Sequence, residues 1–220
     1  SEGDAENAPT LDNFDMSTEF WQQLRSDMLS NKPRAECTKC YEQERVLKGH
    51  KRSKSLRHWM NSLFPHIDKN TLTDDPDNIR YIEMSIDNLC NFQCRMCDSK
   101  FSSQLQKRDA YMGQRVHKKL EPNFTKFDDK DLSNLEYIKL LGGEPFMSPN
   151  FGPFLDYLSS KGASFDNIRL QISTNGSRRP KPELLNKLKQ FSKIEINVSL
   201  DAWHPINDYQ RVGGVYTDVY

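Results

Sequence analysis

Three of the five cysteines lie on one short stretch, residues 87–100, which reads DNLCNFQCRMCDSK. They are Cys90, Cys94 and Cys97, separated by three residues and then by two. Thiolates are soft ligands, so three of them on one loop indicate a zinc ion or an iron–sulfur cluster. A structural zinc ion takes four protein ligands, whereas three thiolates on a cluster of four irons leave the fourth iron open. The spacing therefore predicts a metal centre with one position kept for another molecule.

Four stretches of alternating apolar residues predict strands, and each runs into polar or glycine residues. The alternating residues are Ile82, Met84 and Ile86; Ile138 and Leu140; Ile168, Leu170 and Ile172; and Ile194, Ile196, Val198 and Leu200. The residues that follow are Cys90; Gly142 to Glu144; Ser173 to Gly176; and Ser199 to Asp201. Parallel α/β folds build their sites at the carboxyl ends of the strands. We therefore expect these groups to meet in one site.

Helical patterns separate the four predicted strands. They cover Phe101 to Val116, Phe154 to Ser160 and Glu183 to Phe191, and Pro182 stands where the first turn of a helix tolerates proline. Strands that alternate with helices are joined by crossover connections, which favour a parallel sheet. The predicted fold class is α/β.

With these motifs in this order, the chain resembles the radical S-adenosylmethionine (SAM) superfamily. CNFQCRMC is similar to its C-x3-C-x-Φ-C signature, and LLGGEP is similar to the GGE motif after its second strand. The resemblance implies that the three cysteines hold a [4Fe–4S] cluster whose open iron binds SAM. Glu144 would then lie at the SAM amino group. Further SAM contacts are implied for Phe92, Met96, Gly142, Gly143, Ser173, Asn175, Ser199, Asp201 and Arg211.

The same resemblance implies an enzyme. In this family an electron passed through the cluster cleaves the sulfonium bond of SAM, and the 5′-deoxyadenosyl radical abstracts a hydrogen atom from the substrate. The implied partners are an electron donor such as flavodoxin or ferredoxin and a substrate that is a small molecule or a peptide.

The resemblance covers residues 79–220 and stops after the fourth strand, although barrels of this family usually have six. It implies a partial (β/α) barrel that is apparently truncated after that strand, so that the fourth strand is an unpaired edge. We expect the chain to be a fragment.

The front of the chain, residues 1–75, is expected to be a small, mainly helical segment separate from the core at 76–220. Its first residues are acidic and small and are typical of disorder, and the polar run DKNTLTDDPDN (Asp68 to Asn78) is typical of a linker. Two helices are predicted from apolar periodicity. Their apolar residues are Phe20, Leu24 and Met28, and then Leu56, Trp59, Met60 and Leu63.

Cys37 and Cys40 form a second, incomplete set of thiols in this segment. The order of features around them resembles radical SAM proteins with an N-terminal twitch- or SPASM-like segment. That resemblance implies that the pair helps to hold an auxiliary [4Fe–4S] cluster. The alternatives are a redox pair or two ordinary thiols, and a thioredoxin-like pair would follow a strand, whereas this one lies between predicted helices.

Composition narrows the setting of the protein. The net charge is zero with 28% charged residues, so no overall field draws the chain toward nucleic acid or membrane. No apolar run approaches the roughly 18 residues of a membrane span, and no signal peptide opens the sequence. An odd, clustered set of cysteines is a poor disulfide framework and a good metal framework. We therefore expect a cytoplasmic protein.

Two other functions compete with the radical enzyme. A zinc-binding interaction module would complete the cysteine triplet with a histidine or with the pair at residues 37 and 40. A catalytically silent SAM-site scaffold would bind partners through the basic run HKRSKSLRH (His50 to His58), which is otherwise a solvated helix face. His204 is either a structural residue or an acid or base facing the substrate.

Overall fold

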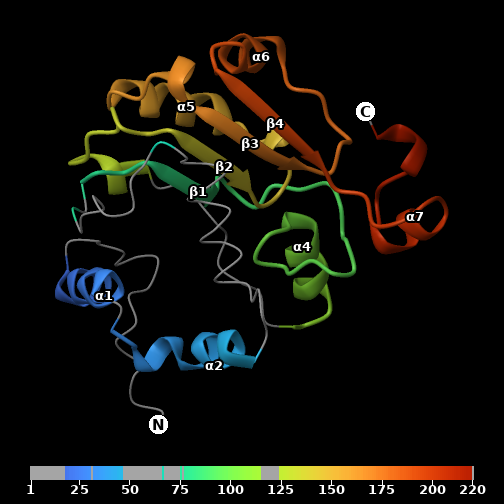
Figure 1. Ribbon diagram of the computed structural model, residues 1–220. Helices are drawn as coiled ribbons and strands as arrows, with labels where there is room; N and C mark the ends of the chain where they lie inside the picture. Colours follow the sequence, from blue (N-terminus) through green and yellow to red (C-terminus); the bar gives the residue numbers. More distant parts are fainter. Residues whose placement is uncertain are drawn as a thin grey trace. The chain divides into compact units, whose positions relative to one another are not determined.

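The computed structural model describes residues 18–30, 32–46, 66, 75, 77–114 and 124–219, in two compact units, 1–77 and 78–220 (Figure 1). Several expectations fall outside the described residues. They concern the acidic first residues, the helix around Leu56 to Leu63, the basic run His50 to His58 and most of the polar run Asp68 to Asn78. Among the described helices, none is long and apolar enough to cross a membrane.

The C-terminal unit is built on a four-stranded sheet in the order β1-β2-β3-β4, with every neighbouring pair parallel. The strands are β1 (Tyr81–Ser85), β2 (Tyr137–Leu141), β3 (Arg169–Thr174) and β4 (Lys193–Val198). Each connection between neighbours contains a helix, as parallel strands require. The predicted α/β class and the parallel sheet are confirmed.

The main helices of this unit follow the strands in turn. They are α4 (Ser103–Tyr111) after β1, α5 (Phe151–Ser160) after β2, and α6 (Pro182–Leu188) after β3. Short helical elements are η5 (Phe124–Phe127), η6 (Pro145–Met147), η7 (Phe165–Asn167), α7 (Ile206–Gln210) and η8 (Tyr216–Asp218). Pro182 occupies the first turn of α6, as predicted.

Helix α4 is shorter at both ends than the predicted span of 101–116. It begins at Ser103 because the Ser102 hydroxyl accepts a hydrogen bond from the Leu105 amide at 3.3 Å, which caps the first turn. It ends at Tyr111, and Gly113 follows in a left-handed conformation with φ of 65°, a common way to terminate a helix. Helix α5 begins earlier than predicted, at Phe151, and α6 ends earlier, at Leu188.

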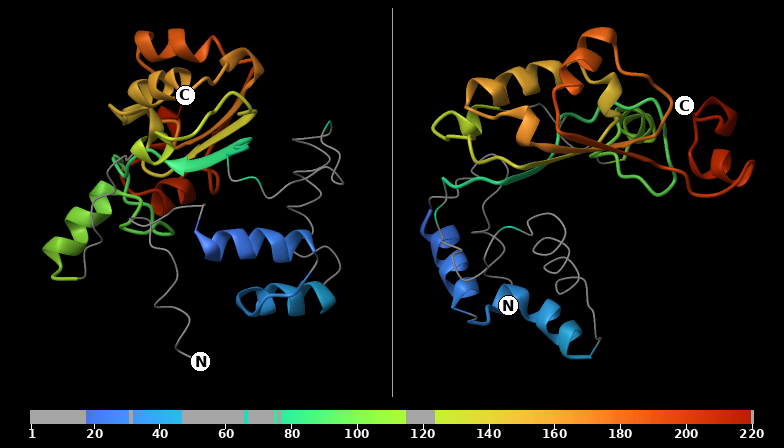
Figure 2. Two further views of the ribbon diagram at one scale, coloured as in Figure 1. Left: turned by 90° about the vertical axis from the view of Figure 1, so that its left-hand side faces the viewer. Right: turned by 45° about the horizontal axis from the view of Figure 1, so that its top comes forward.

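The hydrophobic core lies between one face of the sheet and helices α5 and α6, which both lie on that side (Figure 2). Each buried Leu, Ile or Phe side chain contributes about 1.5–3 kcal/mol to this packing. Fully buried members are Phe151, Phe154, Leu155 and Leu158 of α5 and Ile138, Leu140, Leu170 and Ile172 of the strands.

The opposite face of the sheet is polar. The rings of Tyr81 and Tyr137 stack on it with centroids 5.3 Å apart, and the Lys139 ammonium lies 3.2 Å from the Glu83 carboxylate. A shift of one residue in register would bury these groups in the core, so the alternation determines the pairing of the strands. It also places Ser85, at the C-terminal end of β1, on this polar face.

Strand β4 is less covered than its alternating pattern predicts. Ile196 and Val198 are 51% and 38% exposed. Within the described part of the chain β4 pairs with β3 alone, so its other edge has no partner strand there. An edge at the fourth strand agrees with the expectation from the sequence.

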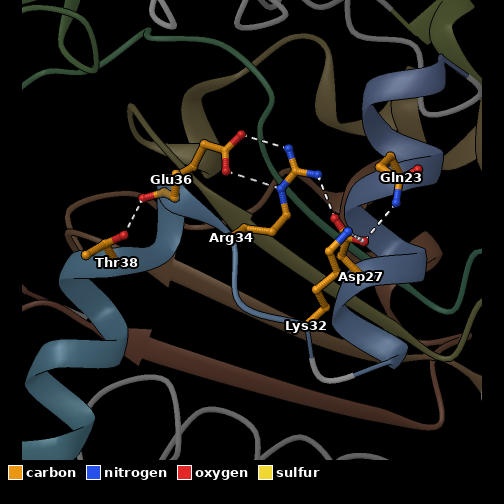
Figure 3. Close-up of polar contacts among 7 residues, drawn as sticks. Gln23, Asp27, Lys32, Arg34, Glu36 and Thr38 are labelled. Carbon is orange, nitrogen blue, oxygen red and sulfur yellow. Dashed lines mark hydrogen bonds and ion pairs between the residues drawn. The ribbon is translucent and has the colours of Figure 1, made fainter. Parts of the chain in front are cut away.

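The N-terminal unit contains α1 (Glu19–Leu29), η2 (Ala35–Cys37) and α2 (Thr38–Val46). Met28, which the periodicity of α1 placed on an apolar face, is 57% exposed, whereas the neighbouring Asp27 is buried. The reason is a polar network (Figure 3), in which the Asp27 carboxylate accepts hydrogen bonds from Arg34 at 3.0 Å and from Gln23 at 2.8 Å.

Candidate active site

The carboxyl ends of the strands and the cysteine loop line one pocket of about 390 Å³ in the C-terminal unit. This volume lies within the usual range for small-molecule and cofactor sites. Most of the predicted site residues of this unit line it: Cys90, Phe92, Cys94, Met96, Cys97, Gly142, Gly143, Ser173, Asn175, Ser199 and Arg211.

The start of the cysteine loop is held by the N-terminus of α4. The Ser103 hydroxyl accepts a hydrogen bond from the Cys90 amide at 3.1 Å, and the Ser102 hydroxyl donates to the Phe92 carbonyl at 2.8 Å. Phe92 is buried, so its ring also anchors the loop. The residue that caps the helix therefore also positions the segment between the first two cysteines.

A second segment, residues 209–214, holds the same loop from another side. The Gln93 amide donates to the Val212 carbonyl at 2.7 Å, and the Arg95 amide donates to the Gln210 carbonyl at 2.8 Å. The Arg95 guanidinium lies over the Tyr209 ring at 4.1 Å from the centroid and donates to the Tyr209 carbonyl at 2.8 Å. We call this segment the strap.

The three thiols differ in exposure: Cys90 is buried, Cys94 is intermediate and Cys97 is exposed. Burial raises the pKa of all three, and it raises that of Cys94 to about 11 even though the Arg211 guanidinium opposes this shift. Thiolates crowded in one pocket also repel one another, which further raises the pKa values of Cys90 and Cys94. A bound metal centre would reverse this balance because its positive charge favours thiolate ligands.

The donor set fits a cluster better than a single ion. In the described part of the chain, no three His, Cys, Asp or Glu side chains are close enough together to hold one metal ion. The three thiols instead surround a shared pocket. Three thiolates that leave a fourth position open suit an iron–sulfur cluster.

The two glycines after β2 allow close packing of this turn against the segment that leads to the cysteines. Gly142 has φ of 76°, and a Cβ atom there would lie 2.3 Å from the Ser85 hydroxyl oxygen. At Gly143 a Cβ atom would lie 2.4 Å from the Leu89 carbonyl oxygen. Contacts this short are not tolerated, so packing within the chain itself requires glycine at both positions.

Glu144 is fully buried and does not line the pocket. Its carboxylate accepts hydrogen bonds from the Thr174 hydroxyl and the Asn175 amide, both at 2.7 Å, and from the Phe146 amide at 3.2 Å. Burial raises the pKa of this carboxyl, and the three hydrogen bonds partly offset that rise. In this arrangement Glu144 joins the end of β2 to the end of β3 beneath the pocket.

Asp201 also lies outside the pocket lining, but it pairs with a residue that is part of it. The Arg211 Nε lies 2.8 Å from the Asp201 carboxylate, and the Arg211 Nη1 lies 4.0 Å from the Cys94 Sγ. His204, considered as an acid or base, is not among the lining residues, and its Nε2 lies 3.5 Å from Asp208.

The lining residues that the sequence did not single out as ligand contacts are Ser85, Phe101, Leu141 and Thr174, although Thr174 lies within the predicted group Ser173 to Gly176. Ser85 pairs with Leu141 in the register of β1 and β2, so the alternation could have indicated both. Thr174 lies between two predicted residues, and its hydroxyl reaches Glu144. Nothing in the local sequence distinguishes that contact.

Cys37 and Cys40 belong to the N-terminal unit, at the end of η2 and within α2. The turn before Cys37 is held by Arg34, whose guanidinium donates two hydrogen bonds to the Glu36 carboxylate at 2.7 and 3.2 Å (Figure 3). The Thr38 hydroxyl donates to the Ala35 carbonyl at 2.7 Å and closes the same turn.

The family match lies within the C-terminal unit. The model of the family described as the radical SAM superfamily matches residues 84–219. A GTP 3',8-cyclase of Nitrobacter winogradskyi is 28% identical over 128 residues, which cover 58% of this chain and 35% of that protein. A GTP 3',8-cyclase of Brucella ovis is 28% identical over 127 residues, which cover 58% of this chain and 34% of that protein. The chain thus spans about a third of the length of these curated relatives.

Two solved structures of Streptococcus suis SuiB resemble the chain weakly. One has a TM-score of 0.37 and 16% identity and covers 80% of this chain and 37% of SuiB. The other, of SuiB bound to S-adenosylmethionine, has a TM-score of 0.36 and 13% identity and covers 89% of this chain and 42% of SuiB.

Proposed function

The chain belongs to the radical SAM superfamily, and we propose that it is part of an enzyme that cleaves SAM reductively and abstracts a hydrogen atom from a substrate. Members of this family use a [4Fe–4S] cluster and SAM. When bound, these groups supply an electron and a 5′-deoxyadenosyl radical. One observation carries the proposal: three thiols and the carboxyl ends of the strands line the same pocket.

Cys90, Cys94 and Cys97 would hold the cluster. The strap and the N-terminus of α4 support this role, because the loop is held by the protein's own hydrogen bonds, which involve the amides of Gln93 and Arg95 and the amide of Cys90. A ligand loop that is already ordered loses less conformational entropy when it binds. The bonds formed by the loop therefore favour cluster binding.

SAM would occupy the remaining volume of the pocket. Gly142 and Gly143 would let the backbone approach SAM closely. Hydrogen-bonding groups at the ends of β3 and β4 come from Ser173, Asn175 and Ser199. Phe92 and Met96 supply apolar surface to the same pocket, and Arg211 supplies a positive charge near Cys94. The mixture suits a ligand with a polar amino-acid end and a ribose.

Glu144 is proposed to act on SAM from beneath the pocket. Its carboxylate holds the Asn175 amide at 2.7 Å, and the Asn175 side chain donates to Asn91 at 3.0 Å, within the cysteine loop. Through these bonds the buried carboxylate links the end of β3 to the cluster ligands. Contact with the SAM amino group, which the resemblance implies, would require this carboxylate to become accessible.

An auxiliary [4Fe–4S] cluster is the proposed role of Cys37 and Cys40. The bonds that Arg34 and Thr38 make around Cys37 support it, because they give this thiol a defined turn. Two thiols do not complete a common site, so further ligands would have to come from elsewhere in the protein.

The proposed partners are an electron donor such as flavodoxin or ferredoxin and a substrate that is a small molecule or a peptide. The names of the relatives make GTP one compound to test directly. The cytoplasm, where thiols stay reduced, is the proposed location.

Electron paramagnetic resonance of anaerobically reconstituted, dithionite-reduced protein tests the proposal. We expect a [4Fe–4S] signal with a component that changes when SAM is added, and this SAM-sensitive component should disappear in Cys94→Ala and persist in Cys37→Ala. Liquid chromatography with mass spectrometry should detect 5′-deoxyadenosine in the same samples. A silent spectrum together with one tightly bound zinc per chain would support the zinc module instead.

A further inference from the structure

Arg211 places a fixed positive charge beside a candidate cluster ligand. Its side chain is only 13% exposed, its Nη1 lies 4.0 Å from the Cys94 Sγ, and its Nε lies 2.8 Å from Asp201 Oδ2. One end of the guanidinium therefore faces the ligand, and the other forms an ion pair with a carboxylate.

The main chain holds this charge pair in place. The Arg211 amide donates to the Asn207 carbonyl at 2.7 Å, and the Asp201 amide donates to the Asn207 side-chain oxygen at 3.1 Å. Asn207 is itself buried, with 2% exposed. The strap then bonds to the cysteine loop through Val212. Through Asn207 and Val212 the backbone of both residues is tied to the loop that carries Cys94.

The charge of a site affects how readily a cluster in it takes up an electron. Three thiolates already make the site negative, and the added electron increases that negative charge. Net charge and hydrogen bonds to the sulfurs are among the factors that set cluster potentials. A cation near the ligands favours the reduced state, and an anion near them disfavours it.

We propose that Arg211 and Asp201 are positioning residues of opposite effect that set the reduction potential of the cluster held by Cys90, Cys94 and Cys97. The inference rests on the proposed function, because it requires that cluster. It gives both residues a role that exists in the absence of SAM. Arg211 raises the potential, and Asp201 limits that rise.

The test is a potentiometric titration of the full chain, reconstituted anaerobically and followed by electron paramagnetic resonance without SAM. In Arg211→Gln we expect the ratio of reduced to oxidised cluster at a fixed potential to fall about tenfold, a shift of about 59 mV for a one-electron couple. In Asp201→Asn we expect a shift of the opposite sign. Arg211→Lys keeps the positive charge, so its reduction potential should lie close to that of the wild type. Lys187→Gln, a control on α6, should leave the potential unchanged.

The direction of the shifts separates this role from a merely structural one. A loosened loop would admit water, which stabilises the more highly charged reduced site and raises the potential in every variant of the pair. A potential in Arg211→Gln that is unchanged or raised would overturn the inference, as would a lowered potential in Asp201→Asn. If Arg211→Gln binds no cluster, Arg211→Met, which also removes the charge but keeps a long side chain, is titrated in its place, and the same lowered potential is expected. A wild-type chain that assembles no cluster would overturn the proposed function itself.

Discussion

Replacing Gly142 by alanine is expected to destabilise the C-terminal unit by about 2–5 kcal/mol. The left-handed conformation at Gly142, with φ of 76°, costs an alanine about 1–2 kcal/mol. The new Cβ would also lie 2.3 Å from the Ser85 Oγ and 2.4 Å from the Ser85 Cβ. Relieving an overlap of this kind typically costs about 1–3 kcal/mol. The sum is a large share of the roughly 5–15 kcal/mol that stabilises a typical domain.

Gly113→Ala is the matched control for the conformational part of this cost. Gly113 has a similar φ of 65°, but a Cβ atom there would meet nothing within 4 Å. We therefore expect it to cost only about 1–2 kcal/mol. The difference between the two variants measures the overlap with Ser85.

A double-mutant cycle with Ser85→Gly isolates that overlap. Ser85→Gly removes the Ser85 Oγ and Cβ, the two atoms that an alanine at position 142 would overlap. The Asp87 carbonyl oxygen, 3.3 Å from the new Cβ, would remain. Gly142→Ala should therefore cost about 1–3 kcal/mol less in the Ser85→Gly background than in the wild type.

The assay is equilibrium unfolding in urea, monitored by far-UV circular dichroism without cluster or SAM. The slopes of unfolding free energy against urea concentration are compared, because equal slopes show that the denatured state is unchanged. An overlap with Ser85 would be excluded if Gly142→Ala cost no more than Gly113→Ala, or if the cycle gave no coupling. Either result would mean that the turn after β2 can move away from β1.

Three further predictions concern the supports of the site. Burial raises the pKa of Glu144 above its ordinary value of 4.5, so the contribution of this carboxyl to stability is present below pH 4.5 and is lost as pH rises through the folded-state pKa. The unfolding free energy of the wild type, measured in urea relative to Glu144→Gln, should therefore fall with rising pH. A difference that stays constant with pH would contradict this. Ser102→Ala should cost at least the roughly 0.5–2 kcal/mol of a helix cap in urea unfolding, because α4 loses its cap and the Phe92 carbonyl loses its donor. The exposed Ser133→Ala should cost much less, and equal losses would argue against both roles of Ser102. The Arg95 and Tyr209 side chains should be coupled by about 0.5–1 kcal/mol in a cycle of Arg95→Met and Tyr209→Leu, and additive effects would exclude a cation–π contribution.

The sequence was sufficient to predict the parallel sheet and the edge at which the site lies. Alternation with period two is a local property, and it indicated which side of each strand faces the core, although Ile86 and Leu200, predicted as strand residues, lie beyond the ends of β1 and β4. The spacing of Cys90, Cys94 and Cys97 is also local, and it indicated a metal centre with an open position. Since parallel strands present their carboxyl ends at one edge, these local signals were enough to bring most of the pocket lining together.

The tertiary structure decided what the polar residues at that edge contact. Arg95 and the Tyr209 carbonyl are 114 residues apart in the chain, and Arg211 and Cys94 are 117 apart. No periodicity relates such positions, because their contact depends on how the strap packs against the cysteine loop. The same is true of Glu144. Its carboxylate accepts hydrogen bonds from Thr174 at the end of β3, from Asn175 just after it and from Phe146 in η6, and it lies outside the pocket lining. A sequence pattern determines which face of an element a residue occupies, but the partner of a buried polar group depends on which other elements pack against that face.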